Sequence, residues 1–309
     1  MGLRAWPRMV QGKGHTLEGA KQTRLAALVS IVVNLGLIGA ELGVALATGS
    51  LAVLADAGHS LVDLAASVFA YWGVTMAARP PDRGHPYGHA KFENFSSLVQ
   101  VGLLALIAVL VVVHVGVQLA LGHTLAVPEA AIGVVLATMV VDFVAARYLG
   151  SVAVTYGSYA LEADSLHFAT DLWAKAGALV GLVGARLGYP WLDPAAALAI
   201  ALAMGYAAVR LGMRTSHGLL DAAPSASVEE RVHRILTEEA GRDTYHSLRM
   251  RQAGKWVYLD VALDLPGEVS LEEAHDLACR IARRLHDEID EVRDAVVYVE
   301  PESHHAEDH

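Results

Sequence analysis

The sequence has a single cysteine among its 309 residues and few charged side chains. Because Cys279 stands alone, an intrachain disulfide and a thiolate metal cluster are excluded, and any metal site must use histidine and carboxylate ligands. Charged residues make up 18% of the chain, against about 25% in ordinary soluble domains. An ordinary soluble protein is therefore not expected.

Apolar residues, at 54% of the chain, gather in runs that reach the roughly 20 residues needed to span a bilayer. Lysine and arginine lie mainly before the first run, between the second and third, and after the fourth and sixth. By the positive-inside rule, this places both termini in the cytoplasm. We predict an integral protein of an inner or plasma membrane with six transmembrane helices. They are expected at about 25–48, 51–78, 92–121, 128–148, 156–187 and 191–211.

The last part of the chain has a different character. From Ser225 to His309 there are 20 acidic and 10 basic residues, so the net charge of −10 belongs to this segment. This acidity excludes a basic nucleic-acid-binding protein; it either attracts cations or is an ordinary solvated surface. Helical and alternating patterns in the order αββαβ predict a small ferredoxin-like α+β domain, which would gain stability from dimerisation. The predicted domains are a cytoplasmic arm at 1–24, a membrane domain at 25–214, a linker at 215–224, a cytoplasmic dimerisation and regulatory domain at 225–302, and a histidine-rich tail at 303–309.

Two histidine–aspartate pairs, each with a spacing of four residues, lie inside apolar helices. Residues four apart share one helix face, so each helix presents two adjacent ligands. An ionisable residue at membrane depth is costly and marks a function, and two imidazoles with two carboxylates can close a tetrahedral shell around zinc. The alternative is two separate interhelical hydrogen bonds between histidine and aspartate. The predicted transport-site ligands are His59, Asp63, His167 and Asp171.

Other polar residues also lie in the apolar segments. Asp56 and Asp164 precede the two histidines by three residues, and are either vestibule groups that attract cations or residues at helix ends. Asp142 lies in the fourth segment, where no spacing supports a ligand role.

Two further groups of candidate ligands lie outside the apolar segments. Asp82, His85 and His89 occupy a loop shaped by glycine and proline, where three ligands would leave one coordination position open. The alternative is a plain polar connector. In the C-terminal domain, either the histidines are merely solvated or they join a carboxylate in a metal site. The candidates there are His246, His275 and Glu300.

Three segments resemble the cation diffusion facilitator family: LADAGHSLVDLAAS in the second apolar helix, HPYGHAKFE in the loop, and EADSLHFATDLWAK in the fifth helix. The later stretches HSLRMRQAG, EEAH and VVYVEP are similar to the family's cytoplasmic domain. The resemblance extends from about Leu25 to Pro301, with the motifs in the family's order. It implies a homodimer that moves divalent transition metals out of the cytoplasm by alternating access, commonly in exchange for protons.

The resemblance also implies residue roles. The four membrane ligands would form the transport site, and the loop residues would match the family's loop site. Lys91 and Asp221 would form a salt bridge between membrane and cytoplasmic parts at the dimer interface. Two histidines of the family's binuclear cytoplasmic site correspond here to Ala262 and Tyr298, which argues against a full binuclear zinc site.

The predicted function is zinc/proton antiport, with no enzymatic activity and no organic cofactor. The partners would be divalent metal ions, protons, the lipid bilayer and a second copy of the chain. A shell of two histidines and two aspartates suits zinc, with cobalt and cadmium close behind and iron(II) as a competitor. The alternatives are the same transport with iron(II), cobalt, cadmium or manganese as the main cargo, or a membrane metal sensor that does not transport. An intramembrane metallohydrolase is disfavoured because the sequence has no HExxH motif.

Overall fold

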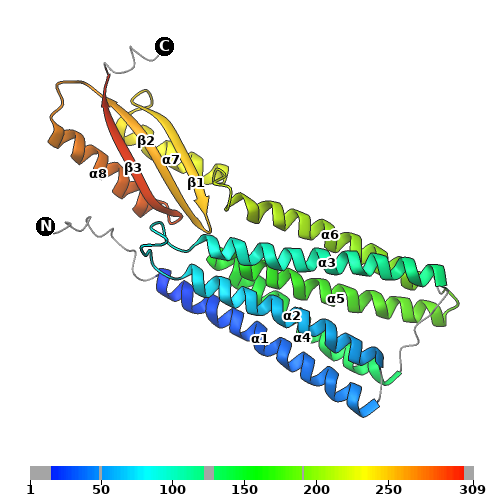
Figure 1. Cartoon of the computed structure of the whole chain (residues 1–309). Coiled ribbons are helices and arrows are strands. Elements are labelled where there is room, and N and C mark those ends of the chain that lie inside the picture. The colour runs from blue at the N-terminus through cyan, green and yellow to red at the C-terminus, as the bar shows by residue number, and fades with distance from the viewer. Residues whose placement is uncertain (1–14, 49–50, 122–128, 190, 303–309) are drawn as a thin grey trace. The chain divides into compact units, whose positions relative to one another are not determined.

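The computed structural model describes residues 15–48, 51–121, 129–189 and 191–302; some side chains within these ranges, among them those of Asp56, His59 and His114, are outside the description. The chain divides into two compact units, Met1–Gly212 and Met213–His309. The first consists of long helices, and the second contains two shorter helices and a small sheet (Figure 1).

The long helices confirm the predicted helical membrane part. Within the described residues, five of the six helices are apolar enough, by length and composition, to cross a membrane. The exception is α5, whose mean hydropathy is lowered by charged residues that include Asp164, Asp171 and Lys175. The helices are α1 (His15–Thr48), α2 (Leu51–Ala77), α3 (Lys91–Leu121), α4 (Glu129–Tyr156), α5 (Tyr159–Arg186) and α6 (Leu192–His217).

Several helices extend beyond the apolar runs that predicted them. The first was expected from Leu25, but α1 already begins at His15, and α4 continues beyond Tyr148 to Tyr156. Hydropathy marks the segment that lies in hydrocarbon, whereas the backbone hydrogen bonds of a helix continue through polar turns. The sequence analysis therefore predicted where the apolar segments end, whereas the helices themselves continue further.

The charged helix α5 packs against α1, α2, α3 and α4, while α1 also packs against α2 and α4. Small residues permit the closest approaches. A Cβ atom added at Gly73 of α2 would lie 2.3 Å from the Cβ of Ser96 on α3, and one added at Gly150 of α4 would lie 2.9 Å from Oγ of Ser165 on α5. The polar side chains of α5 are thereby held against neighbouring helices.

The second unit has the predicted order αββαβ. Its elements are α7 (Ala226–Ala240), β1 (Tyr245–Ala253), β2 (Trp256–Leu265), α8 (Leu271–Glu288) and β3 (Val292–Pro301). In the sheet order β1-β2-β3, β1 is antiparallel to β2, and β3 is parallel to β2.

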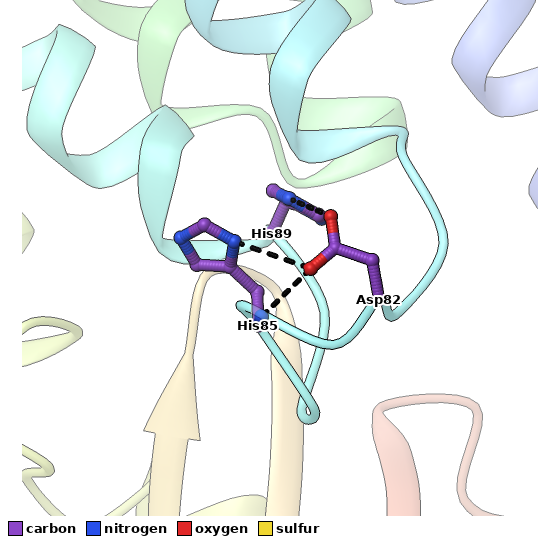
Figure 2. Close-up of side chains that lie close together, drawn as sticks. All are labelled: Asp82, His85 and His89. Atoms are coloured by element: carbon purple, nitrogen blue, oxygen red, sulfur yellow. Dashed lines mark hydrogen bonds and ion pairs between the residues drawn. The ribbon is translucent and has the colours of Figure 1, made fainter.

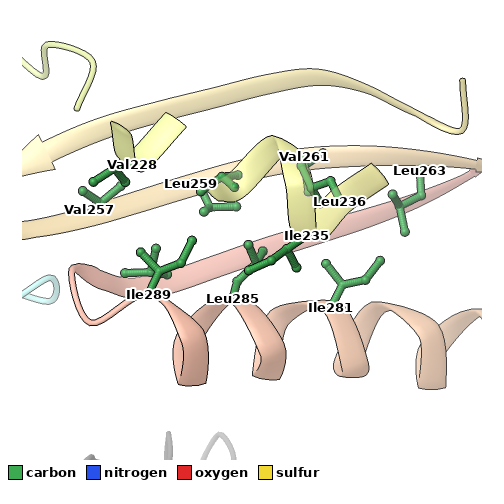
Figure 3. Close-up of a cluster of buried hydrophobic side chains, with 12 residues drawn as sticks. Val228, Ile235, Leu236, Val257, Leu259, Val261, Leu263, Ile281, Leu285 and Ile289 are labelled. Atoms are coloured by element: carbon green, nitrogen blue, oxygen red, sulfur yellow. The ribbon is translucent and has the colours of Figure 1, made fainter. Parts of the chain in front are cut away.

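The core of this unit follows from simple sequence periodicities. Alternate residues of β2 point to one face of the sheet, where α7 and α8 cover them (Figure 3). A capping box starts α8: the Ser270 hydroxyl accepts from the Glu273 N–H, and the Glu273 carboxylate accepts from the Ser270 N–H. The buried core residues are Val228, Val232, Ile235, Leu236, Val257, Leu259, Val261, Leu263, Ile281, Leu285, Ile289 and Val292.

The contact at Gly73 yields a stability prediction. Gly73→Ala should destabilise the protein by about 1–3 kcal/mol, because the added methyl group would overlap Ser96 and push α2 away from α3. Thermal unfolding in detergent measures the effect. Gly102→Ala is the matched control, since nothing lies within 4 Å of a Cβ added there. Equal melting temperatures for the two variants would contradict the close packing of α2 and α3.

Candidate metal sites

Helices α2 and α5 bring together three of the four predicted membrane ligands. Nε2 of His167 lies 2.8 Å from Oδ1 of Asp63 and 3.6 Å from Oδ2 of Asp171. One ligand atom from each residue lies within 4.8 Å of the other two. Asp63 and His167 are buried, and Asp171 is half-buried. Residues from distant parts of the sequence therefore converge on one small volume between the helices.

This geometry favours a cation site over a simple hydrogen bond. An interhelical pair would need His167 and Asp63 alone, but Asp171 adds a second carboxylate to the same group. Two carboxylates held so close in a buried setting repel each other unless a positive charge lies between them, either on a protonated His167 or on a bound cation. One imidazole nitrogen and two carboxylate oxygens are ligands that zinc accepts.

The fourth predicted ligand, His59, lies in α2, but its side chain is outside the described residues. The helical backbone places its Cα one turn before Asp63 on the same face. Its role as a ligand stays a prediction.

Serine and asparagine side chains of α1 and α2 form a hydrogen-bond network with Asp164 of α5. The Ser67 hydroxyl donates to Oδ1 of Asp164 at 3.0 Å, and Ser67 Oγ accepts from the Asn34 amide at 2.8 Å. Ser30 shares a 2.7 Å hydrogen bond with Ser67. Asp164 is completely buried within α5, so the expectation of a vestibule or helix-end residue was wrong for it. It belongs to a polar network that joins α1, α2 and α5.

The loop between α2 and α3 also gathers its predicted ligands (Figure 2). Oδ2 of Asp82 lies 3.3 Å from Nε2 of His89, and Oδ1 lies 3.5 Å from Nδ1 of His85. The two imidazole rings are 4.4 Å apart, centre to centre. Gly88 supports the tight turn with a φ of 89°. The structure therefore places all three predicted loop residues in one group.

Two hydrogen-bond arrangements prepare this loop for a cation. Nδ1 of His89 lies 3.2 Å from the Pro80 carbonyl oxygen, which can only accept, so Nδ1 donates and Nε2 of the neutral ring is left facing Asp82. Histidines that bind metals are commonly oriented in this way. The backbone N–H groups of His85 and Gly84 donate to Oδ1 of Asp82, and they hold the pKa of that carboxyl below its usual value.

In the second unit, the structure joins two of the three predicted residues and adds a third that the sequence did not indicate. Nε2 of His246 lies 3.3 Å from Oδ1 of Asp264 and 3.9 Å from Oε2 of Glu300. Asp264 and Glu300 are register partners on the parallel strands β2 and β3. His275 is not part of this group; its Nε2 lies 3.5 Å from Sγ of Cys279 on α8.

The predicted salt bridge between Lys91 and Asp221 connects the two units and stays a prediction. Within the second unit, Oδ1 of Asp221 accepts a hydrogen bond from Arg251 at 3.2 Å.

A second buried charged contact contains a residue that the sequence analysis missed. Nζ of Lys175 on α5 lies 2.6 Å from Oδ2 of Asp142 on α4. The sequence spacing could have pointed to Lys175, because it follows Asp171 by the same four residues that separate Asp171 from His167.

Comparison with known families identifies both parts of the chain. Residues 27–220 match the family model described as the cation efflux transmembrane domain, and residues 224–302 match the cytoplasmic domain of cation efflux proteins. The chain therefore belongs to the cation efflux family, whose members are the cation diffusion facilitators, and is an integral membrane protein. The predicted resemblance is confirmed.

Individual relatives are similar along most of their length. The chain is 34% identical to the cation-efflux pump FieF of Shewanella oneidensis over 82% of this chain and 86% of that protein. It is 32% identical to an uncharacterised transporter of Synechocystis sp. over 84% of each chain. A solved structure described as that of a candidate zinc transporter, CzrB, in its zinc form, is 28% identical over 26% of this chain and 93% of that one. Its TM-score of 0.25 carries no weight for the fold of the whole chain.

The loop geometry predicts how zinc binding there depends on pH. In a chain with Asp171→Ala and His246→Ala, zinc affinity should fall from about pH 7.5 to 5.5, because protons compete for imidazole nitrogen in this range. Protonation of Asp82 should not cause this loss of zinc affinity, because the lowered pKa of this carboxyl keeps it ionised in this pH range. The contribution of Asp82 to zinc binding is lost only as the pH falls through that lowered pKa. Zinc titration at several pH values measures the number of protons released for each zinc ion that binds.

At pH 5.5, His85→Ala should reduce that number by about one proton per zinc ion, because most free imidazole is protonated at this pH and one imidazole is removed from the group. His217→Ala, a change outside the loop group, is the control and should leave it unchanged. An unchanged proton release in the His85 variant would contradict a ligand role for this histidine.

Proposed function

We propose that this chain is a zinc/proton antiporter that exports zinc from the cytoplasm by alternating access, with Asp63, His167, Asp171 and His59 as ligands. The observation that carries the proposal is the convergence of Asp63, His167 and Asp171 between α2 and α5. Membership of the cation efflux family supports transport as the use of this site.

The donor set supports zinc as the main cargo. Two imidazoles and two carboxylates make a four-coordinate shell of the kind that zinc prefers, and the two negative charges balance a divalent ion. Manganese favours more oxygen ligands, and copper(I) favours sulfur. Iron(II), cobalt and cadmium are the competing cargoes, because imidazole and carboxylate also bind them.

In this proposal, protons are the ions that enter in exchange for the exported metal. Metal binding requires neutral imidazole and ionised carboxylate, so protons and metal compete for the same ligand atoms. Metal loads from the cytoplasm, the helices that hold the site reorient, and incoming protons displace the ion on the other side. Both termini lie in the cytoplasm in this proposal, in agreement with the distribution of lysine and arginine.

The remaining groups serve capture and regulation. The loop residues Asp82, His85 and His89 offer a looser, partly exposed site that would hold cytoplasmic metal before transport. His246, Asp264 and Glu300 would bind a regulatory ion in the cytoplasmic domain, through which two copies associate. A sensor without transport is the alternative function, and this last group is the observation that favours it.

Loss of one membrane ligand should abolish transport. In proteoliposomes with a pH gradient, Asp171→Ala should reduce zinc flux by at least about 100-fold, because even residues that only support metal ligands are worth 10- to 100-fold. Asp276→Ala, which removes an exposed carboxylate on α8, should leave flux unchanged. Cobalt, cadmium, iron(II) and manganese are tested in parallel to rank the cargo.

No flux of any ion through the wild-type protein, with zinc still bound, would favour the sensor. Equal fluxes through the wild type and the Asp171 variant would remove this carboxylate from the transport site.

Replacing the unobserved fourth ligand should alter selectivity. His59→Asp should shift the cargo toward manganese and iron(II) and reduce the competition by protons near neutral pH, because a carboxylate is a harder ligand and binds protons less tightly than imidazole. Flux measured for each metal at several pH values reports both effects. His59→Ala, which supplies no ligand, should lower flux for all metals. Unchanged selectivity and proton coupling in His59→Asp would contradict the proposed role.

A further inference from the structure

The ion pair between Lys175 and Asp142 lies outside the groups of candidate metal ligands. The Lys175 ammonium donates to Oδ2 of Asp142 at 2.6 Å, joining α5 to α4. The Asp142 side chain is 1% exposed and that of Lys175 is 20% exposed. Charged residues inside membrane segments are costly and usually functional. A buried ion pair is also a weak source of stability, because apolar residues of similar volume often replace it without loss.

The position of Lys175 links this pair to the proposed transport site. His167, Asp171 and Lys175 follow one another at intervals of four along α5 and so share one helix face. Lys175 is one turn beyond Asp171, a rise of about 6 Å along the axis. An acidic residue four positions before a lysine is the favourable order for an ion pair on a helix. The flexible four-carbon stem of lysine allows its ammonium group to reach Asp142 or Asp171 by a change of rotamer.

The negative charges of the proposed transport site would attract the Lys175 ammonium group when the site is empty. When the cargo leaves, only the His167 imidazole lies between the carboxylates of Asp63 and Asp171 in place of the divalent ion. Lys175 lies on the same helix one turn beyond Asp171, and its side chain is not exposed. It is therefore a cation that can approach the emptied site.

We propose that Lys175 is a tethered competitor of the cargo metal, which pairs with Asp171 when the site is empty and is drawn back to Asp142 when metal binds. Lys175 is thus a positioning residue that sets the affinity of the site, and Asp142 sets how readily the lysine withdraws. Metal binds only while the ammonium group is away from Asp171, so the apparent affinity falls with the fraction of time that Lys175 spends there. This inference rests on the proposed function, because it assumes that Asp171 is a cargo ligand.

Zinc titration against a fluorescent chelator tests the proposal on the full-length chain in detergent. His89→Ala and His246→Ala are introduced into every sample so that the membrane site alone is measured. Asp142→Asn should weaken zinc binding by about 5- to 10-fold, because the freed lysine turns to Asp171, and Lys175→Met should strengthen it by a similar factor. The double variant should match Lys175→Met, because Asp142 acts only through the lysine. Arg147→Met, which removes an exposed cation from α4, should have no effect.

A purely structural ion pair predicts a different order of affinities. Both single variants would then bind zinc more weakly, and the double variant would recover; this result would overturn the proposal, as would an unchanged affinity in Lys175→Met. Thermal unfolding checks that each variant is folded, and Lys175→Gln, with the same expected strengthening, replaces the methionine variant if that variant does not fold. If the wild-type site binds no zinc, the proposed function fails and this inference fails with it. If the wild type binds zinc but the variants do not follow the predicted order, only the role of Lys175 is rejected.

Discussion

The contact between His167 and Asp63 is the interaction on which the proposed transport site depends. It spans 2.8 Å between α5 and α2, and it brings the carboxylates of Asp63 and Asp171 to one imidazole nitrogen. Like charges at this separation in a buried setting are unstable without a cation. A positive charge between the two carboxylates, carried by a protonated His167 or by a bound cation, relieves this repulsion, and in the proposed function the transported metal ion is that cation.

A further buried carboxyl on α5 is bonded through only one of its oxygens. The Ser67 hydroxyl donates to Oδ1 of Asp164 and Ser67 Oγ accepts from the Asn34 amide, whereas Oδ2 of Asp164 is buried with no hydrogen-bond partner among the described residues. Lys175 and Asp142 add an ion pair at the contact of α5 with α4. The long helix that is not apolar enough by composition to count as a membrane span, α5, thus packs against the four helices α1, α2, α3 and α4, which supply partners for its polar side chains.

Much of this organisation could be predicted from the sequence, and the failures have physical causes. Runs of apolar residues predicted the helices, and the order αββαβ followed from changes of periodicity. The loop ligands are close in sequence, so their convergence was also foreseeable. Asp264 was missed because its approach to His246 depends on strand pairing, in which Asp264 aligns with Glu300. His275 was wrongly grouped with them, since its helix places it beside Cys279.

The most direct test is X-ray absorption at the zinc edge, on a full-length chain that lacks the loop and cytoplasmic-domain ligands His89 and His246. We expect one bound zinc ion with two imidazole nitrogens and two carboxylate oxygens at about 2.0–2.2 Å. One of these imidazoles should disappear in His59→Ala. A zinc shell made of oxygen alone, or one that His59→Ala leaves unchanged, would contradict the proposed site.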